Sequence, residues 1–269
     1  MRKGPMHTVV CVKQVPETSN VQMDEKTGTV RREGIESIIN PLDLYAIEMA
    51  VRLKEQHGGH VTVLSMGPRA AEKAVREAIA MGCDAGALIS DHAFAGSDTH
   101  ATSYVLSRAI AKAGPFELIL TGVRTTDGET GQVGPGIAAF LDIALCTYVS
   151  RILSLEGNWL AVERLVESGY EALQLPMPCL LSVTNEIAFP RLPTLRGKQA
   201  ARKAPVPVWG PEDLRADRDL IGLAGSPTRV VRIDKAVTAR TGRIVDARRL
   251  GAPAAVAELA SFLAENGLL

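Results

Sequence analysis

One glycine-rich stretch, Gly122–Pro135, carries residue types that bind phosphate. It reads Gly-Val-Arg-Thr-Thr-Asp-Gly-Glu-Thr-Gly-Gln-Val-Gly-Pro and lies between an apolar strand-like run, Leu118–Leu120, and an apolar helix-like run, Ile137–Leu141. A turn in this position presents unpaired backbone N–H groups at the positive end of a helix dipole, where anions bind. Its glycines let the backbone approach a ligand closely, and its threonine and glutamine side chains add donors.

The stretch differs from the two best-known phosphate motifs. It lacks the Gly-Lys-Ser/Thr of a P-loop, so it has no lysine for a γ-phosphate, and its glycine spacing is not GxGxxG. We therefore expect a nucleotide that is bound and held rather than hydrolysed. An ordinary strand–turn–helix connection would give the same pattern, so that alternative stays open.

The composition of the chain argues against nucleic-acid binding and membrane insertion. The chain has 269 residues with 30 basic and 30 acidic side chains, so no overall field attracts nucleic acid or an anionic membrane. Aromatic residues make up 4% of the chain, which is few for stacking on bases. No run reaches the ~18 apolar residues of a membrane helix, and no signal peptide is visible. We expect a cytoplasmic protein without direct membrane insertion.

The spacing of cysteines and histidines gives little support to metal or nucleophile chemistry. The cysteines form no Cys-x-x-Cys pair and three lie in apolar runs, which predicts buried structural thiols. The histidines have no metal-ligand spacing, and no Ser-His-Asp arrangement can be argued. We predict no metal site and no catalytic residue. The residues concerned are Cys11, Cys83, Cys146, Cys179, His7, His57, His60, His92 and His100.

Strand-like and helix-like patterns alternate up to residue 145. Asn40, Pro41 and Asp43 mark the start of the first helix as N-cap, first helical residue and acid at the positive end. Repeated βα units predict an α/β fold with a doubly wound, mostly parallel sheet covered by helices on both faces. The expected strands are Thr8–Val12, His60–Leu64, Ala87–Ile89 and Glu117–Thr121, and the expected helices are Leu42–Leu53, Ala70–Met81 and Thr99–Ala113.

Ligands of such sheets bind beyond the carboxyl ends of the strands. Four segments should meet there, although they lie far apart in the sequence: Val12–Pro16, Asn40–Asp43, Ser65–Pro68 and the loop after Thr121. This convergence gives the glycine-rich stretch more weight than a lone motif would have.

Beyond residue 145 the pattern changes. The segments with β character predict an antiparallel meander that extends the sheet. They are Thr147–Leu155, Trp159–Val166, Tyr170–Leu175 and Cys179–Val183. Thr184–Pro211 then has five prolines and five basic residues, and we expect a long irregular segment of the kind that is functional or disordered. A hairpin within Val21–Arg32, a strand at Arg229–Ile233 and a final helix at Ala254–Asn266 complete the prediction.

Several motifs in these elements resemble the β subunit of electron transfer flavoproteins, along nearly the whole chain. The opening Val-Cys-Val-Lys-Gln-Val-Pro of Val10–Pro16, Asn40-Pro-Leu-Asp43, Lys54-Glu55 and Ala80-Met-Gly-Cys-Asp84 are similar to that family. The most diagnostic block is Val-Glu-Arg-Leu-Val-Glu-Ser-Gly-Tyr-Glu-Ala-Leu at 162–173, followed by Pro-Cys-Leu-Leu-Ser at 178–182. Ser168 departs from the family's usual glycine or acid, a mild change within a turn.

The resemblance implies an adenine nucleotide α-hydrolase-like fold and a division of labour between two subunits. An α subunit carries the electron-transferring flavin, and the β subunit holds an adenine nucleotide, which is AMP in housekeeping members and a second FAD in electron-bifurcating members. Asp127–Pro135 looks like the bifurcating type, with Glu129 and Gly131 as conservative departures. Gly128 in place of an acid removes a negative charge beside a diphosphate. We therefore favour FAD, with AMP as the alternative.

The Val123–Thr126 run departs from the family's usual Lys-Gln-Ala/Ser-Ile, although Arg124 still supplies positive charge. The cofactor-binding positions that the resemblance implies lie in four segments. They are Cys11, Lys13, Gln14, Val15, Asn40, Pro41, Leu42, Asp43, Met66, Gly122, Val123, Arg124, Thr125, Thr126, Asp127, Gly128, Glu129, Thr130, Gly131, Gln132 and Val133. For Cys11 and Met66 the residues alone favour core packing, and for Asn40 a helix N-cap.

The resemblance also assigns three regions. Residues 1–183 would be the nucleotide-binding domain with its meander, 184–211 a recognition loop for partner flavin dehydrogenases, and 212–269 a C-terminal arm that contacts the α subunit. The partner-binding residues would be Arg191, Leu192, Pro193 and Leu195, with Leu192 as an exposed apolar anchor in a basic rim. Taken without the family, the loop would be interpreted as a flexible linker.

The functional expectation is an electron carrier without a nucleophile or general base of its own. It would pass electrons between a dehydrogenase or NADH and the α-subunit flavin, and a second FAD would take a hydride from NADH and split the electron pair between two acceptors. A rival from another class is a stand-alone adenine-nucleotide sensor of the universal-stress type, which shares the βα architecture. The meander and the Leu192 loop argue against that rival, since a compact sensor needs neither.

Overall fold

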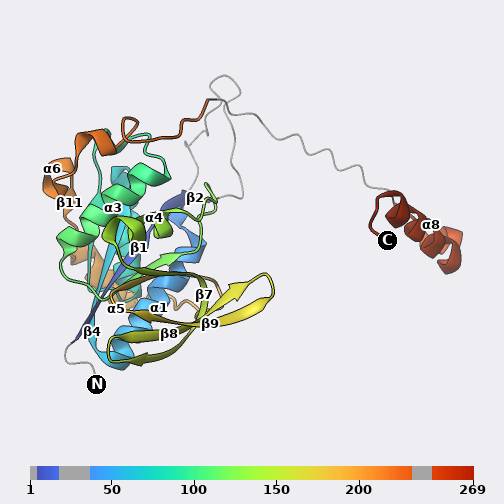
Figure 1. The fold of residues 1–269 in the computed structure, drawn as a ribbon, viewed down its shortest axis with the longest axis horizontal. Coiled ribbons are helices and arrows are strands. Elements are labelled where there is room, and N and C mark those ends of the chain that lie inside the picture. The colour runs from blue at the N-terminus through green and yellow to red at the C-terminus, as the bar shows by residue number, and fades with distance from the viewer. Residues whose placement is uncertain (1–4, 18–36, 232–243) are drawn as a thin grey trace. The chain divides into compact units, whose positions relative to one another are not determined.

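The computed structural model describes residues 5–17, 37–231 and 244–269. The hairpin predicted within Val21–Arg32 lies outside the described residues. The chain divides into two units, Met1–Val231 and Arg232–Leu269. The first unit contains a large sheet with helices on both faces (Figure 1), which confirms the predicted α/β class. Among the described residues, no helix combines the length and the apolarity needed to cross a bilayer.

The sheet of the first unit has the strand order β11-β5-β4-β1-β6-β10-β7-β8-β9. Neighbouring strands are parallel from β11 to β7, and β8 and β9 continue the sheet antiparallel. The strands of this sheet are β1 Met6–Val12, β4 Gly59–Met66, β5 Ala85–Ile89, β6 Leu118–Gly122, β7 Ala144–Glu156, β8 Trp159–Val166, β9 Gly169–Pro176, β10 Cys179–Val183 and β11 Val208–Trp209. A separate antiparallel pair consists of β2 Gln14–Pro16 and β3 Ser37–Ile39.

Two layers of helices cover the sheet, and alternate residues of β1 point into them. Val10 and Val12 belong to the cluster that α1, α2 and α5 cover. Val9 and Cys11 belong to the cluster under α3, α4 and α6. The helices are α1 Pro41–His57, α2 Glu72–Met81, α3 Thr99–Ala113, α4 Val133–Leu141, α5 Leu195–Lys203 and α6 Pro211–Leu214, with short 3₁₀ turns at η2 Arg69–Ala71, η3 His92–Phe94 and η4 Arg218–Leu220.

The prediction is wrong for one strand of the meander. Cys179–Val183 is β10, which lies parallel between β6 and β7 inside the sheet. All five of its residues are buried. A strand covered on both faces shows a continuous apolar run rather than alternation, which is the mark of a parallel sheet. The other three segments do form the antiparallel part, as predicted.

The predicted irregular segment Thr184–Pro211 is also wrong in part, because it contains α5 and β11. Thr194 caps α5 by accepting the Gly197 N–H at 2.9 Å. Arg76 of α2 donates to the backbone oxygen of Ala201 at 2.6 Å. The prolines that suggested disorder stand on either side of the helix, where they do not interrupt its hydrogen bonds.

In the second unit, the described residues 244–269 form two helices, α7 Ala247–Leu250 and α8 Ala252–Glu265, and neither has a buried residue. The final helix predicted at Ala254–Asn266 is thus confirmed within two residues at either end. The strand predicted at Arg229–Ile233 is wrong for residues 229–231, which have no regular structure, and its last two residues lie outside the described ranges.

Candidate functional site

The glycine-rich loop follows a strand that sits at a topological switch point. After β1, the chain adds β4 and β5 on one side and then returns to place β6 on the other side of β1. Crevices at the carboxyl ends of strands that flank such a reversal are the usual ligand sites of open α/β sheets. The loop after β6 and the segment after β1 both lie at the carboxyl ends of these strands, where the sequence predicted a ligand site.

Asp43 ties the two strand ends together. Its carboxylate, in the first turn of α1, accepts the Lys13 N–H at 2.7 Å and the Gly122 N–H at 3.2 Å. Burial raises the pKa of Asp43 to about 7, although these hydrogen bonds and Lys13 oppose the rise. A side chain at Gly122 would collide with Asp43 and the backbone of Leu42. Glycine is therefore required there by the packing of the chain itself.

Asn40 stands at the predicted N-cap position of α1, but its side chain does not cap the helix. The residue is fully buried. Its amide instead donates to the Arg124 oxygen at 2.9 Å and accepts the Thr126 N–H at 3.2 Å. The N-cap interpretation of the side chain is therefore wrong. Asn40 satisfies both of its polar atoms on the backbone of the glycine-rich loop and holds that loop against α1.

An ion pair crosses from the end of β1 to the loop. The Lys13 Nζ lies 2.8 Å from Asp127 Oδ1 and 2.7 Å from Oδ2. Burial would raise the pKa of Asp127, but hydrogen bonds from Lys13 and Thr125 outweigh it and hold the pKa below its usual value. Lys13 thus places a cationic group between the end of β1 and the glycine-rich loop, bound to a carboxylate that stays charged.

Unpaired donors line the loop and the start of α4. Within the described chain, the N–H groups of Gly128, Gly131 and Gly134 make no hydrogen bond. The hydroxyls of Thr121 and Ser182, at the ends of β6 and β10, are buried without a partner. A buried polar group without a partner is costly, and N–H groups at a helix start attract anions. The donor set fits an anionic group such as a phosphate.

The remaining loop residues differ in burial and backbone conformation. Val123 is buried, with its N–H bonded to the Val183 oxygen at 3.1 Å. Glu129 adopts a left-handed conformation with φ of 51°. The exposed positions are Arg124, Thr126, Asp127, Gly128, Glu129, Thr130 and Gln132, and the half-buried ones are Gly122, Thr125, Gly131 and Val133.

Outside the loop, the predicted positions divide into two groups. Pro41 is exposed at the start of α1 and Gln14 donates to the Ala70 oxygen at 3.2 Å, which brings the segment after β1 close to the segment after β4. Val15 and Cys11 are buried. Leu42 and Met66 are half-buried, Met66 against the cluster under α3.

The cysteines are as buried as the sequence predicted. All four are buried and free. Burial raises the pKa of the Cys11 thiol to about 12, with a smaller contribution from the charge of Asp43. A thiol with so high a pKa is a poor nucleophile. For Cys11, packing in the core is therefore the role that the structure supports.

Exposed apolar side chains mark the loop before α5. Leu192 is 87% exposed and Leu195 is 88% exposed. Phe189 is 84% exposed and was not among the predicted partner-binding residues. Arg191, which was among them, turns inward and pairs with Glu48 and Glu55 of α1. This pairing could not be predicted from the sequence, because the residues are more than 130 positions apart.

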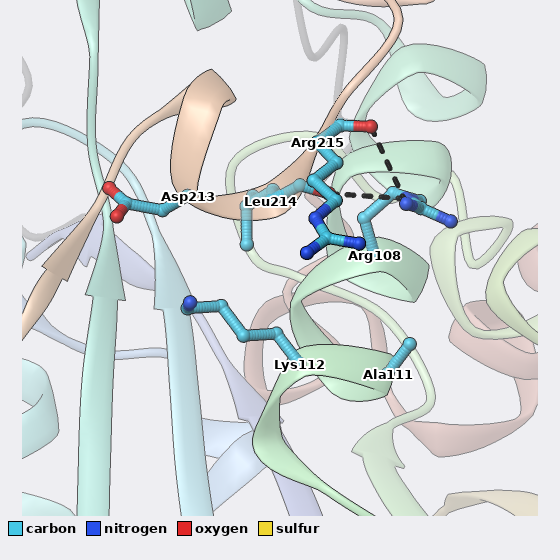
Figure 2. Close-up of a pocket in the computed structure, with 6 residues that line it drawn as sticks. All are labelled: Arg108, Ala111, Lys112, Asp213, Leu214 and Arg215. Carbon is cyan, nitrogen blue, oxygen red and sulfur yellow. Dashed lines mark hydrogen bonds between the residues drawn. The ribbon is translucent and has the colours of Figure 1, made fainter.

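A separate hollow of about 280 Å³ lies between α3 and the turn after α6 (Figure 2). Its basic side chains are mostly engaged in the fold. Arg108 donates to the Leu214 and Arg215 oxygens, and Lys112 lies 5.4 Å from the ring centre of Trp209. None of the predicted site residues lines this hollow. It therefore gives no argument for a ligand.

The chain is similar to known proteins over most of its length. The Electron transfer flavoprotein domain family matches residues 27–214. The electron transfer flavoprotein subunit β of Thermoanaerobacterium thermosaccharolyticum is 46% identical over 240 residues, which cover 89% of this chain and 92% of that protein. Protein FixA of Azotobacter vinelandii is 46% identical over 237 residues, covering 85% and 83%. The caffeyl-CoA reductase-Etf complex subunit CarD of Acetobacterium woodii is 42% identical over 228 residues, covering 84% and 87%.

Proposed function

The chain belongs to the electron transfer flavoprotein family as a β subunit, and from that premise we propose that it holds an adenine nucleotide, preferably FAD, at the crevice between β1 and β6. In this role it pairs with an α subunit and passes electrons between a flavin dehydrogenase or NADH and the α-subunit flavin. Family membership leaves no support for the stand-alone sensor of the universal-stress type.

The observation that carries the nucleotide proposal is the set of unpaired donors beside the crevice. The N–H groups of Gly128, Gly131 and Gly134, which have no hydrogen-bond acceptor among the described residues, and the start of α4 suit a phosphate, and an anion there would be stabilised by the helix dipole. Asn40 and Asp43 hold the backbone around these donors in place. Preorganised donors bind a phosphate without the cost of ordering a mobile loop.

Gly128 supports FAD over AMP. Its ideal Cβ would lie 3.6 Å from the Thr125 hydroxyl, an ordinary contact, and its φ is not in the left-handed region. The packing of the chain therefore leaves room for a side chain at this position, unlike at Gly122. An acid at position 128 would place a negative charge beside a diphosphate, so the glycine favours a dinucleotide with two phosphates.

The residues of this chain position the nucleotide rather than react with it. Bound FAD would supply the two-electron chemistry with NADH. Lys13, between the end of β1 and the glycine-rich loop, would offer its ammonium to phosphate oxygens or keep Asp127 from repelling them. Asn40 would keep the loop closed against α1 and exclude water from one side of the ligand.

The partner proposals rest on the loop before α5 and on the second unit. Leu192 and Leu195 would insert into a flavin dehydrogenase, and the helices after residue 244 would contact the α subunit. A cytoplasmic location of the complex stays a prediction from the sequence.

The test is the nucleotide content of the chain co-purified with its α subunit, measured by acid release and chromatography. We expect two FAD per heterodimer and no AMP, followed by flavin reduction when NADH is added. One FAD with one AMP would make the protein a simple carrier and overturn the argument from Gly128. One FAD and no second nucleotide would overturn the nucleotide site itself.

A matched pair of variants tests whether charge or side-chain volume at position 128 affects FAD binding. Gly128→Ala adds volume without charge, and Gly128→Asp adds a negative charge at the same position. The FAD content should be kept in the first variant and should fall in the second, because one uncompensated charge near a phosphate costs on the order of 1–2 kcal/mol, which weakens the affinity about 5- to 30-fold. Equal FAD content in both would contradict the electrostatic explanation.

A further inference from the structure

Arg191 lies inside the docking segment, by which we mean Phe189–Leu195, and its guanidinium faces α1. The Nε donates to Glu48 Oε2 at 2.8 Å, and one terminal nitrogen donates to Glu48 Oε1 at 3.2 Å. Both terminal nitrogens also bond to the two carboxylate oxygens of Glu55, one of them at 2.9 Å. The backbone N–H of Arg191 donates to Glu48 at 3.0 Å. A single side chain thus bridges two carboxylates with nearly all of its donors.

Glu48 is the buried half of this cluster, with its side chain 3% exposed. Burial would raise the pKa of Glu48, but hydrogen bonds from Arg191 and Arg52 outweigh it and hold the pKa below its usual value. Arg52 bonds to Glu48 Oε1 at 2.6 Å and also to the Phe189 oxygen at 3.3 Å. The cluster contains two arginines and two glutamates, so its charges balance.

The far end of the segment continues into α5, which packs against α2. Gly197, in the first turn of α5, lies so close to the Ala80 backbone oxygen that a Cβ there would collide with it. Arg76 of α2 donates to the Ala201 and Ala204 oxygens at 2.6 and 3.1 Å. The docking segment is therefore fixed to α1 directly, and α5, which follows it, is packed against α2.

Between these two attachments the chain presents three strongly exposed apolar side chains. Phe189, Leu192 and Leu195 are each more than 80% exposed. Arg196 and Lys198 follow them and are exposed as well. An apolar anchor beside two cations suits a partner surface with an apolar cleft and an acidic rim.

We propose that Arg191 is a positioning residue, which with Glu48, Glu55 and Arg52 fixes the docking segment so that Leu192 is presented to a partner in a single orientation. The proposal rests on the proposed function, because it takes Leu192 as the docking anchor. It also removes Arg191 from the contact surface, where the sequence had placed it.

The physical reason is preorganisation. A loop that is ordered before binding does not lose conformational entropy in the complex, so its anchor binds more tightly at the same contact area. Arginine suits this task better than lysine, since its planar fork can serve two carboxylates at once. The same helix that carries Glu48 and Glu55 begins with Asn40 and Asp43, so the docking segment is attached to an element of the nucleotide crevice.

The test uses the full chain in complex with its α subunit and compares three variants. Arg191→Gln removes the charge, and the remaining Glu48–Arg52 pair keeps the buried carboxylate compensated. Leu192→Ala removes the anchor without touching the cluster. Arg218→Gln is the matched control, because it breaks an exposed Arg–Glu pair, 2.6 Å long, outside the docking segment.

Two measurements are made on each variant. Amide hydrogen exchange reports the order of residues 187–195, with β1 and β6 as the internal reference for global stability. Flavin reduction reports the KM and kcat of the heterodimer with the purified flavin dehydrogenase that passes electrons to the wild type.

In Arg191→Gln we expect the amides of residues 187–195 to exchange about tenfold faster and KM to rise about tenfold, with kcat and the β1 and β6 amides unchanged. Leu192→Ala should raise KM without changing exchange, Arg191→Lys should fall between wild type and Arg191→Gln, and Arg218→Gln should change neither.

Unchanged exchange in Arg191→Gln would overturn the proposal. The proposal would also be overturned if Arg191→Gln speeds exchange but leaves KM unchanged while Leu192→Ala raises KM. If instead KM stays unchanged in Leu192→Ala itself, the docking function fails, and the exchange data still decide whether the cluster orders the segment.

Discussion

Asn40 and Asp43 are two buried polar side chains at the start of α1, and both bond to backbone of the crevice rather than to their own helix. In the sequence, Asn-Pro-x-Asp is also the signature of a capped helix start. The type of residue therefore predicted a helix boundary correctly, but the direction of each side chain depends on a loop 80 residues further along. Local sequence does not contain that information.

Asp43 predicts a pH dependence of stability. Burial raises the pKa of its carboxyl from 3.8 to about 7, so the folded state holds the proton more tightly than the unfolded state. The resulting stabilisation is fully present below pH 3.8 and is lost as pH rises through about 7. The free energy of unfolding should therefore fall by up to about 1.4 kcal/mol per pH unit in that window from this group.

The measurement is denaturant unfolding of wild type and Asp43→Asn at pH 5, 6, 7 and 8. Asparagine does not titrate, and the two proteins share every other titrating group. The difference between their free energies of unfolding therefore reports on Asp43 alone. The difference between the two proteins should shift against the wild type from pH 5 to about 7 and level off above it. Two parallel stability curves would contradict the raised pKa.

At the scale of elements, the predictions succeeded where a segment shows one clear periodicity. The helix at Thr99–Ala113 has the predicted bounds, and Trp159–Val166 is a strand as predicted. Cys179–Val183 was assigned to the wrong neighbours, because an apolar run predicts burial but not the strands it pairs with. The convergence of four segments at one sheet edge was predictable from βα alternation, whereas the bonds among them were not.

The packing of α5 on α2 predicts the sign of one substitution. Alanine normally stabilises a helix relative to glycine by about 0.5–1 kcal/mol. At Gly197, however, the new Cβ would collide with the Ala80 oxygen, so α5 must move and the stability should fall by about 1–3 kcal/mol. Denaturant unfolding measures the change.

Gly210→Ala serves as the control, since its Cβ would lie 3.5 Å from Asp91 Oδ2, an ordinary contact. Its stability should change by less than about 0.5 kcal/mol. A stabilised Gly197→Ala protein would mean that α5 is not held against α2, and the attachment of the docking segment at that end would be wrong.

The two units of the molecule differ in their hydrophobic cores. Both hydrophobic clusters consist of residues from the first unit. In the second unit, α8 exposes Val256, Leu259 and Phe262 at a spacing of three, which is the pattern of a helix with one apolar face. An apolar face of this kind is typical of a surface that another protein covers.

Removal of residues 232–269 should therefore separate folding from assembly. Since the first unit has its own core, the melting temperature of the shortened chain should stay within about 3 °C of the full chain. The affinity for the α subunit should fall at least tenfold, because the apolar face of α8 would no longer be buried there. Calorimetry and sedimentation of the purified subunits measure the two effects. A drop of more than about 10 °C would show that the second unit stabilises the first, and an unchanged affinity would show that the α subunit binds elsewhere.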